Sequence, residues 1–282
     1  MAGWRPVLAA AAGTLLLAGC TSESHSGDGA AGKASPSGSL SASPSASASV
    51  ADEPYTLSEE QAPKTRADAV AFVRELDVRP DYFGVGYRKR EPYESDPATW
   101  AVLQDDCLWQ RVALPKTVLA SLTRTFELPE KAGKGAVYVS LTVTVHTDTV
   151  AARRDMARSM ESALRCPEQR LNATDVVRGL YSQVEAADEG RAPISDDDLT
   201  EVGEWIVDGA SEAHTFDWYK YRLGPVTVAA TARHGAGRSD DEDSAVSSDL
   251  MSGVILVANE IDQTGAGDTA SGTPAEAQGA GR

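Results

Sequence analysis

The histidines and clustered acids are the residues best suited to metal chemistry. His146, His214 and His234 each fall on an expected strand, with no second His or Cys at ligand spacing. A zinc site needs such clustered ligands, so hydrogen-bonded or surface roles are favoured. The acidic runs 196–198 and 240–243 would attract calcium, but both lack the alternating ligands, glycine and final glutamate of an EF-hand loop. Solvated loops or acidic helix starts are the favoured interpretation, and no metal or cofactor is expected.

Aromatic side chains supply the candidate ligand contacts. Trp218 and Tyr219 lie on an expected strand, where alternation turns one of the two inward in either register. With Trp109, Trp205 and Tyr221 they would suit the wall of a pocket for a small or lipid-like molecule. Core packing is the alternative and the favoured one. Whether this aromatic hairpin is core or binding surface stays open at this point.

The sequence holds no signature of a common enzyme. Nucleophile-elbow, Walker and zincin motifs are absent, and Gly84 and Gly86 lack the third glycine of a dinucleotide fingerprint. Lys and Arg number 26 against 42 Asp and Glu, giving a net charge of −16, which argues against nucleic acid as a partner. An enzyme is therefore not expected, and an extracellular hydrolase with an unrecognised site is the alternative.

The amino terminus has the layout of a secretory signal. Arg5 precedes an apolar run over residues 7–18, which is shorter than the roughly 20 residues of a membrane-spanning helix. The run leads into Leu-Ala-Gly-Cys at residues 17–20, a segment that resembles the bacterial lipobox. The resemblance implies cleavage before Cys20 and a diacylglyceryl group on its thiol, which would anchor the protein at the extracellular face of the cell membrane. An ordinary signal peptide, cut near the same point, is the alternative.

Cysteine counting predicts one disulfide. Of three cysteines, Cys107 and Cys166 remain once Cys20 carries the lipid, and exported pairs usually oxidise. Two buried free thiols are the alternative. The composition then divides the chain into a signal peptide (1–19), a lipidated Cys with a Ser/Ala/Gly-rich linker (20–51), one folded domain (52–262) and a disordered tail (263–282).

Alternating apolar residues predict an antiparallel sheet. The alternation is strongest over residues 137–145, which pair with 118–128, and a second hairpin joins 214–223 to 226–233 through a turn at Gly224. The segment 196–206 fits a helix or a strand.

Helices are expected at three places. One begins with a capping box at Thr65 and Asp68, and one covers residues 244–262. The third runs from a cap at 147–149 to Pro167, with a buried face made of Ala152, Met156, Met160 and Leu164. The fold class is therefore α+β, an antiparallel sheet packed with a few helices in a single domain.

This order of elements resembles the PknH-type extracellular sensor domain of actinobacterial kinases and its lipoprotein relatives. The resemblance rests on Cys107, the 137–145 strand, Cys166 followed by Pro167, and the last helix. It implies a sheet covered by helices, a cleft, and binding of an extracellular ligand, although that domain has two disulfides and this one has cysteines for only one. No kinase segment is present.

The expected function is that of an exported, lipid-anchored, non-catalytic sensor-like or ligand-binding protein. Its expected partners are the membrane, through Cys20, and an extracellular small molecule, lipid or envelope protein. A structural or assembly lipoprotein of the envelope is a further alternative.

Overall fold

The computed structural model describes residues 57–183, 195–207 and 209–266. Cys20, the expected signal and linker, and residues 267–282 of the expected tail lie outside the described residues. The elements, in chain order, are α1 (Arg66–Glu75), η1 (Pro80–Phe83), β1 (Arg88–Glu94), β2 (Thr99–Leu103), β3 (Trp109–Ala113), β4 (Val118–Leu128), β5 (Val137–His146), α2 (Thr149–Arg165), β6 (Glu168–Arg170), β7 (Asp175–Gln183), β8 (Asp197–Val207), β9 (His214–Leu223), β10 (Val226–Arg233) and α3 (Asp240–Ala266).

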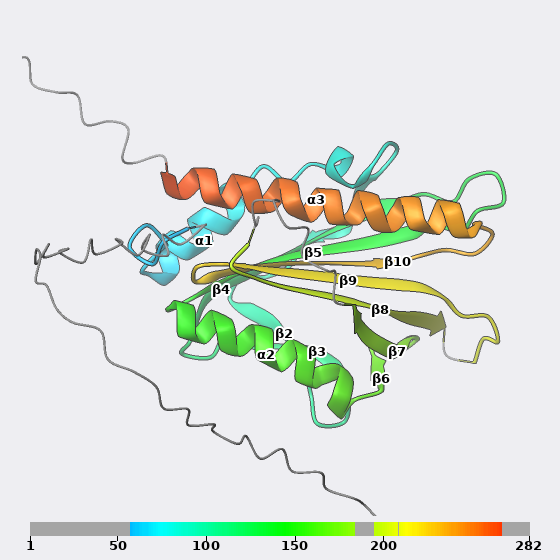
Figure 1. Ribbon diagram of the computed structural model, residues 1–282, viewed down its shortest axis with the longest axis horizontal. Helices are drawn as coiled ribbons and strands as arrows, with labels where there is room; N and C mark the ends of the chain where they lie inside the picture. Colours follow the sequence, from blue (N-terminus) through cyan, green and yellow to red (C-terminus); the bar gives the residue numbers. More distant parts are fainter. Residues whose placement is uncertain (1–56, 184–194, 208, 267–282) are drawn as a thin grey trace, which may run out of the picture. The chain divides into compact units, whose positions relative to one another are not determined.

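One antiparallel sheet organises the described residues. Its eight strands follow the order β1-β4-β5-β10-β9-β8-β7-β6, and β2 and β3 form a separate hairpin. Helices α1 and α3 cover one face of the sheet, whereas α2 and the β2–β3 hairpin lie over the other (Figure 1). The α+β class and both predicted hairpins are confirmed, β4 with β5 and β9 with β10.

The main core lies between the sheet, α1 and α3. Alternate residues of β5 from Val137 to Val145 point into it, as the alternation predicts. Helix α3 packs closely enough on η1 that a Cβ at Gly253 would lie 2.6 Å from a ring atom of Phe83. At the start of α1, the Asp68 amide donates to Thr65 Oγ1 at 3.2 Å, which confirms the predicted cap.

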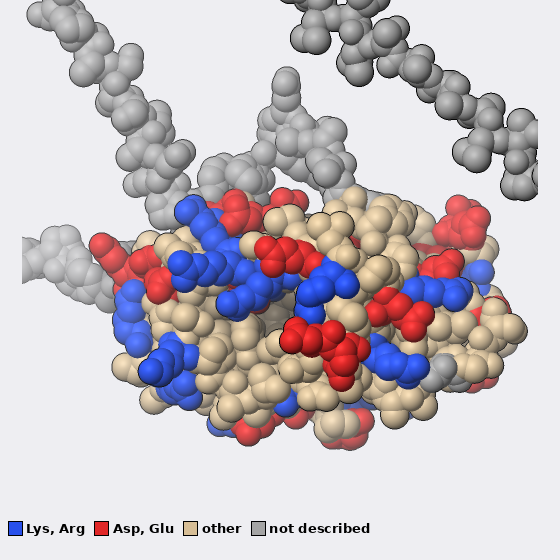
Figure 2. Space-filling model, turned by 90° about the horizontal axis from the view of Figure 1, so that it is seen from below, with Lys and Arg blue, Asp and Glu red and all other residues tan. Residues whose placement is uncertain are grey.

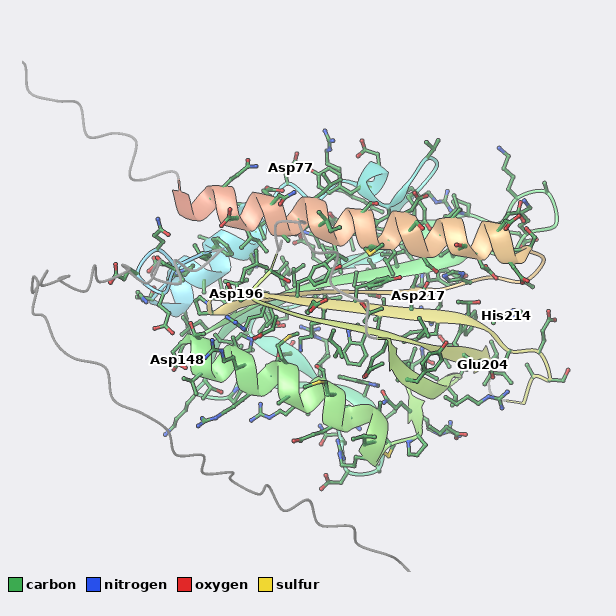
Figure 3. All side chains as sticks on the ribbon, viewed as in Figure 1. Asp77, Asp148, Asp196, Glu204, His214 and Asp217 are labelled. Carbon is green, nitrogen blue, oxygen red and sulfur yellow. A yellow bond between two sulfur atoms is a disulfide. The ribbon has the colours of Figure 1, made fainter. Side chains whose placement is uncertain are left out.

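The expected buried face of α2 is wrong in its second half. Ala152 and Met156 are buried as predicted, but Met160 is 50% exposed and Leu164 is 85% exposed. Ser159 and Ser162 occupy the inward positions instead, because the helix presents to the sheet a face with polar partners. The cap within residues 147–149 is Asp148, whose side chain accepts from the Ala151 amide at 2.7 Å and which stands at the start of α2 in Figure 3.

Several elements differ from the sequence-based expectations. The ambiguous segment 196–206 is strand β8, whose neighbours β7 and β9 supply hydrogen bonds on both sides. Helix α3 begins at Asp240 and continues to Ala266, past the expected end at 262. Its first turn contains the acidic run 240–243, which confirms the interpretation of these charges as a helix start. No helix within the described ranges combines the length and the apolar character needed to cross a membrane.

Candidate functional site

A cavity of about 380 Å³ lies between the sheet and the layer formed by α2 and the β2–β3 hairpin. It is partly open, and Figure 2, which views the molecule from the α2 side, shows this face hollowed between charged side chains of both signs. The volume falls in the range of small-molecule sites, which hold a few polar groups within a mainly apolar lining. The lining comes from strands β2 to β5, β7, β9 and β10, from α2 and from the segment after it.

Short side chains on the sheet leave room for this cavity. Ser121, Ser140, Thr142, Thr144, Thr227, Ala229 and Thr231 form the floor. Layers that pack face to face stand about 10 Å apart, and Ser, Thr and Ala do not reach across such a gap. The cavity therefore follows directly from the residues on one face of β4, β5 and β10.

Some hydroxyl groups of the cavity floor are hydrogen-bonded to neighbouring side chains, and others are not. Ser121 and Thr144 share a hydrogen bond of 2.8 Å. Thr142 is bonded in the same way to Thr123 at 2.8 Å. The Ser140 and Thr231 side chains, which lie opposite each other on β5 and β10, make no hydrogen bond to another described residue. These two hydroxyls are the floor groups free to bond a ligand.

Aromatic rings close one end of the cavity. Trp109 from the hairpin and Trp218 from β9 meet edge to face, with ring centroids 5.8 Å apart. Gln169 fixes the Trp109 ring by accepting from its indole N–H at 2.8 Å. Phe216 and Val177 complete an apolar cluster behind Trp218. This end would accept a ring or an alkyl chain.

A buried ion pair lies at the other end. Lys220 Nζ on β9 is 2.7 Å from Asp155 Oδ2 on α2 and 2.9 Å from Ser159 Oγ. His146 Nε2 approaches the same Asp155 oxygen at 3.5 Å, and Thr227 Oγ1 donates to it at 3.3 Å. Burial raises the pKa of Asp155, but the Lys220 charge and the contact with His146 outweigh burial, so its pKa lies below the ordinary value.

The Ser159 and Lys220 contact does not have the arrangement of a nucleophile and its base. A base must accept the serine proton, whereas Lys220 Nζ donates to Ser159 Oγ and to the Asp155 carboxylate. The Ser159 hydroxyl also donates back to the Asp155 carbonyl at 3.2 Å, as an ordinary helical serine does. The geometry serves to hold α2 on the sheet.

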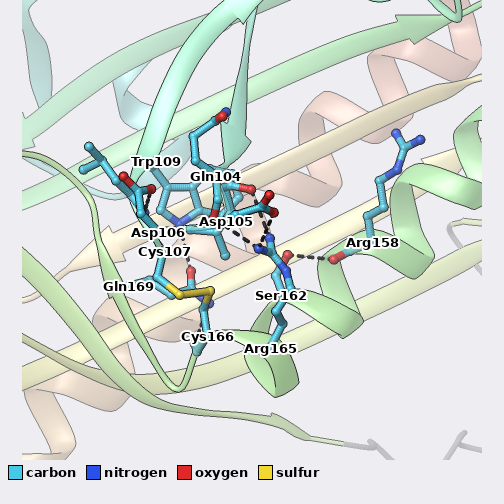
Figure 4. The surroundings of a disulfide bond; sticks show 12 residues. Gln104, Asp105, Asp106, Cys107, Trp109, Arg158, Ser162, Arg165, Cys166 and Gln169 are labelled. Carbon is cyan, nitrogen blue, oxygen red and sulfur yellow. Dashed lines mark hydrogen bonds and ion pairs between the residues drawn. A yellow bond between two sulfur atoms is a disulfide. The ribbon is translucent and has the colours of Figure 1, made fainter.

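The disulfide predicted between Cys107 and Cys166 is present and frames the rim of the cavity. It joins the β2–β3 loop to the end of α2, with a Cα–Cα distance of 5.6 Å. Beside it, Arg165 donates to the carbonyls of Leu103 and Gln104 (Figure 4). The end of α2 is therefore joined to the β2–β3 region both by the disulfide and by these hydrogen bonds. A disulfide of this kind indicates an extracytoplasmic, oxidising environment.

A buried carboxyl lies next to the cavity. Glu201 on β8 pairs with Trp218 across the strands, is fully buried, and has one oxygen without a hydrogen-bond partner among the described residues. Burial raises the pKa of Glu201 to about 7, against smaller opposing effects of Ser182 and Lys220. The sequence analysis did not single out this residue, because no local pattern distinguishes a buried glutamate from a solvated one.

The two candidate ligand contacts lie on opposite faces of the sheet. Trp218 is 8% exposed and lines the cavity, whereas Tyr219 is 6% exposed and belongs to the core under α3. Tyr221 shares the face of Tyr219, and Trp205 packs in the small cluster beside Trp218. The structure thus brings Trp109 and Trp218 together at the cavity and removes both tyrosines from it.

The buried histidines and the acidic runs have protein partners. His234 lies between Asp217 and Asp243, at 2.8 Å from each, and Asp217 appears at the centre of β9 in Figure 3. Arg222 binds Asp196 at 2.9 Å and also Asp197. Among the described residues, no group of three or more His, Cys, Asp and Glu side chains is arranged to hold a metal ion.

Comparison with known proteins identifies no family. No protein-family model matches the chain, and no curated protein matches it. The X-ray structure of an uncharacterized protein from Mycobacterium smegmatis (Rv0999 ortholog) aligns with 71% of this chain and 99% of its own, at 11% identity and a TM-score of 0.30. So distant a likeness says nothing about function.

Proposed function

We propose that the protein is an exported, lipid-anchored binding protein that holds a small amphipathic molecule in the cavity under α2, without catalysing a reaction. The observation that carries the proposal is the cavity lining, which has aromatic rings at one end and unbonded hydroxyls on the floor. Such a lining matches a ligand with an apolar body and a few hydroxyl or carbonyl groups.

The charged groups of the cavity support binding over catalysis. Asp155 and Lys220 form an ion pair with each other, and Arg165 donates hydrogen bonds to backbone carbonyls of the β2–β3 hairpin region. Arg158 at the rim forms no ion pair with a described residue, so it is available to a polar or acidic group of the ligand. The ligand would lie with its apolar part against Trp109 and Trp218 and its polar part toward this rim.

The lipid anchor is the second part of the proposal. The Leu-Ala-Gly-Cys segment supports acylation of Cys20, and the disulfide supports an exported protein. The resemblance to PknH-type sensor domains fits the same role, a ligand-binding domain held at the cell surface. Replacing Cys20 by Ser should release the protein from the membrane fraction and remove its acyl label. Retention of both would contradict the anchor.

Native mass spectrometry of protein purified from its own envelope tests the binding role. We expect a retained mass that is lost in Ala229→Phe, because a phenyl ring at this floor position fills the cavity. The matched control is Ala67→Phe on an exposed position of α1, which should retain the mass. Wild-type protein without a bound molecule, or equal retention by both variants, would contradict the proposal.

A further inference from the structure

The outward face of α2 carries an unusual combination of apolar and basic side chains. Val150 is 53% exposed, Met160 50% and Leu164 85%. Positions 150, 153, 157, 160 and 164 recur at helical spacing, so these apolar groups form one stripe that also contains Arg153. A solvent-facing helix surface normally carries polar groups at such positions.

Basic residues lie within and beside this stripe. Arg153, Arg154 and Arg158 are exposed, and none forms an ion pair with another described residue. Arg165 is paired with Asp105 at 3.4 Å, and Glu161 is the one exposed acid on the helix. The protein as a whole carries a net charge of −16, so this basic helix surface contrasts in sign with the rest of the chain. Apolar side chains flanked by arginines are the chemistry of helices that lie in the interface of an anionic bilayer.

The inner side of α2 is fixed, which makes the outer side a preformed surface. Lys220 holds Asp155 in the middle of the helix, and the disulfide holds its end. The stripe therefore cannot turn inward to bury its apolar groups. The rim of the cavity lies along the same helix, since Arg158, Glu161 and Arg165 contribute to its lining.

We propose that the α2 surface, defined as Val150, Arg153, Arg154, Met160 and Leu164, docks on a bilayer of anionic lipids. The arginines would contact the headgroups, and the apolar stripe would enter the boundary between headgroups and acyl chains. Docking in this way places the cavity rim against the membrane, so that a ligand could pass between lipid and cavity. The inference goes beyond ligand binding and does not require the acyl group on Cys20.

Vesicle cosedimentation tests the docking. The chain from Thr21 to Arg282 contains all the residues that the structure describes and lacks the expected signal and anchor. We expect it to sediment with vesicles of phosphatidylglycerol and phosphatidylcholine but not with vesicles of phosphatidylcholine alone. High salt should dissociate it from the anionic vesicles. Arg153→Glu with Arg154→Glu should lower the affinity by about 30-fold or more, the usual effect of two basic residues at an anionic surface. Leu164→Asp should lower it on the order of tenfold.

Matched substitutions on the other helices are the controls. Arg66→Glu with Arg74→Glu on α1 changes the net charge equally, and Leu256→Asp on α3 replaces a leucine that is 45% exposed. Both should bind vesicles like the parent chain, and circular dichroism should show all variants folded. Equal losses in the α2 variants and the controls, or no preference for anionic lipid, would overturn the proposal.

Two further measurements separate this surface from its competitors. Sedimentation velocity without vesicles should show a monomer; a dimer that Leu164→Asp dissociates would assign the stripe to a second copy and overturn membrane docking. Ala229→Phe should sediment with vesicles normally even though its cavity is filled, so failure of ligand binding and failure of docking are distinguishable.

Discussion

Lys220 on β9 and Asp155 on α2 are joined by a 2.7 Å ion pair between the sheet and the helix that covers it. The Lys220 side chain is 8% exposed and that of Asp155 is 14% exposed, so the pair is largely shielded from water. The pair lines the polar end of the cavity and holds α2 at a fixed distance from the sheet. Because each charge is held out of water by the fold, each depends on the other for compensation.

Removing one partner of this pair should destabilise the fold more than removing both. Asp155→Leu leaves a buried ammonium without its carboxylate and should cost about 3–5 kcal/mol of unfolding free energy. The double variant Asp155→Leu with Lys220→Met should recover much of that loss, since no buried charge remains. Urea unfolding of the parent protein, Asp155→Leu, Lys220→Met and the double variant measures the coupling. A loss in the double variant equal to the sum of the two single losses would show that the pair is not coupled.

The same pair predicts how stability responds to acid. The Asp155 pKa is lowered in the fold from an ordinary value of 3.8, so its stabilising effect is complete above that value and disappears as the pH falls below it. Asp155→Asn should flatten this part of the stability curve. Unfolding experiments between neutral pH and strong acid compare the two slopes, and parallel curves would contradict the assignment.

The disulfide should contribute substantially to stability. Closing the 59-residue separation between Cys107 and Cys166 corresponds to about 4 kcal/mol in the chain-entropy treatment. The Cys107→Ala and Cys166→Ala double variant should therefore unfold at lower urea concentration. Each single variant should lose a similar amount, because one cysteine alone closes no loop. Unchanged unfolding of the double variant would contradict the prediction.

Glu201 should make the protein less stable as the pH rises. The unfolded carboxyl ionises near 4.5, whereas the buried one stays protonated to about 7. The two states bind protons equally below 4.5, and between the two values the unfolded state alone gains the charge, so stability falls through this window. We expect a loss of about 2 kcal/mol after allowance for solvent screening. Glu201→Gln should remove the slope; retention of the slope would assign it to another group.

The sequence determined the local elements better than the cavity between them. Alternation predicted β4, β5, β9 and β10, and cysteine counting predicted the disulfide, because both depend on residue type and spacing. The same alternation cannot say whether Ser140 and Thr142 face water or a second layer, since short hydroxyl side chains suit both. The cavity follows only once α2 and the β2–β3 hairpin are placed over that face.

The error on α2 has a related physical cause. Spacing of four residues predicted Met160 and Leu164 as buried, because apolar residues usually define the inward face. Here Asp155 and Ser159 turn inward to meet Lys220, a partner 65 positions away along the chain from Asp155. The ion pair thus stabilises an orientation of the helix in which Met160 and Leu164 are exposed. Such a contact depends on tertiary structure, so the sequence pattern gave no sign of it.

Trp218 and Tyr219 provide the clearest test of the cavity, because adjacent residues of β9 point to opposite faces. Both are buried, so Trp218→Ala and Tyr219→Ala should each destabilise the fold by roughly 3 kcal/mol or more. Only Trp218→Ala should also release the retained ligand in native mass spectra, since Trp218 lines the cavity and Tyr219 packs under α3. Spectra recorded well below both melting temperatures separate binding from unfolding. Loss of the ligand from Tyr219→Ala but not from Trp218→Ala would place the binding site on the wrong face of the sheet.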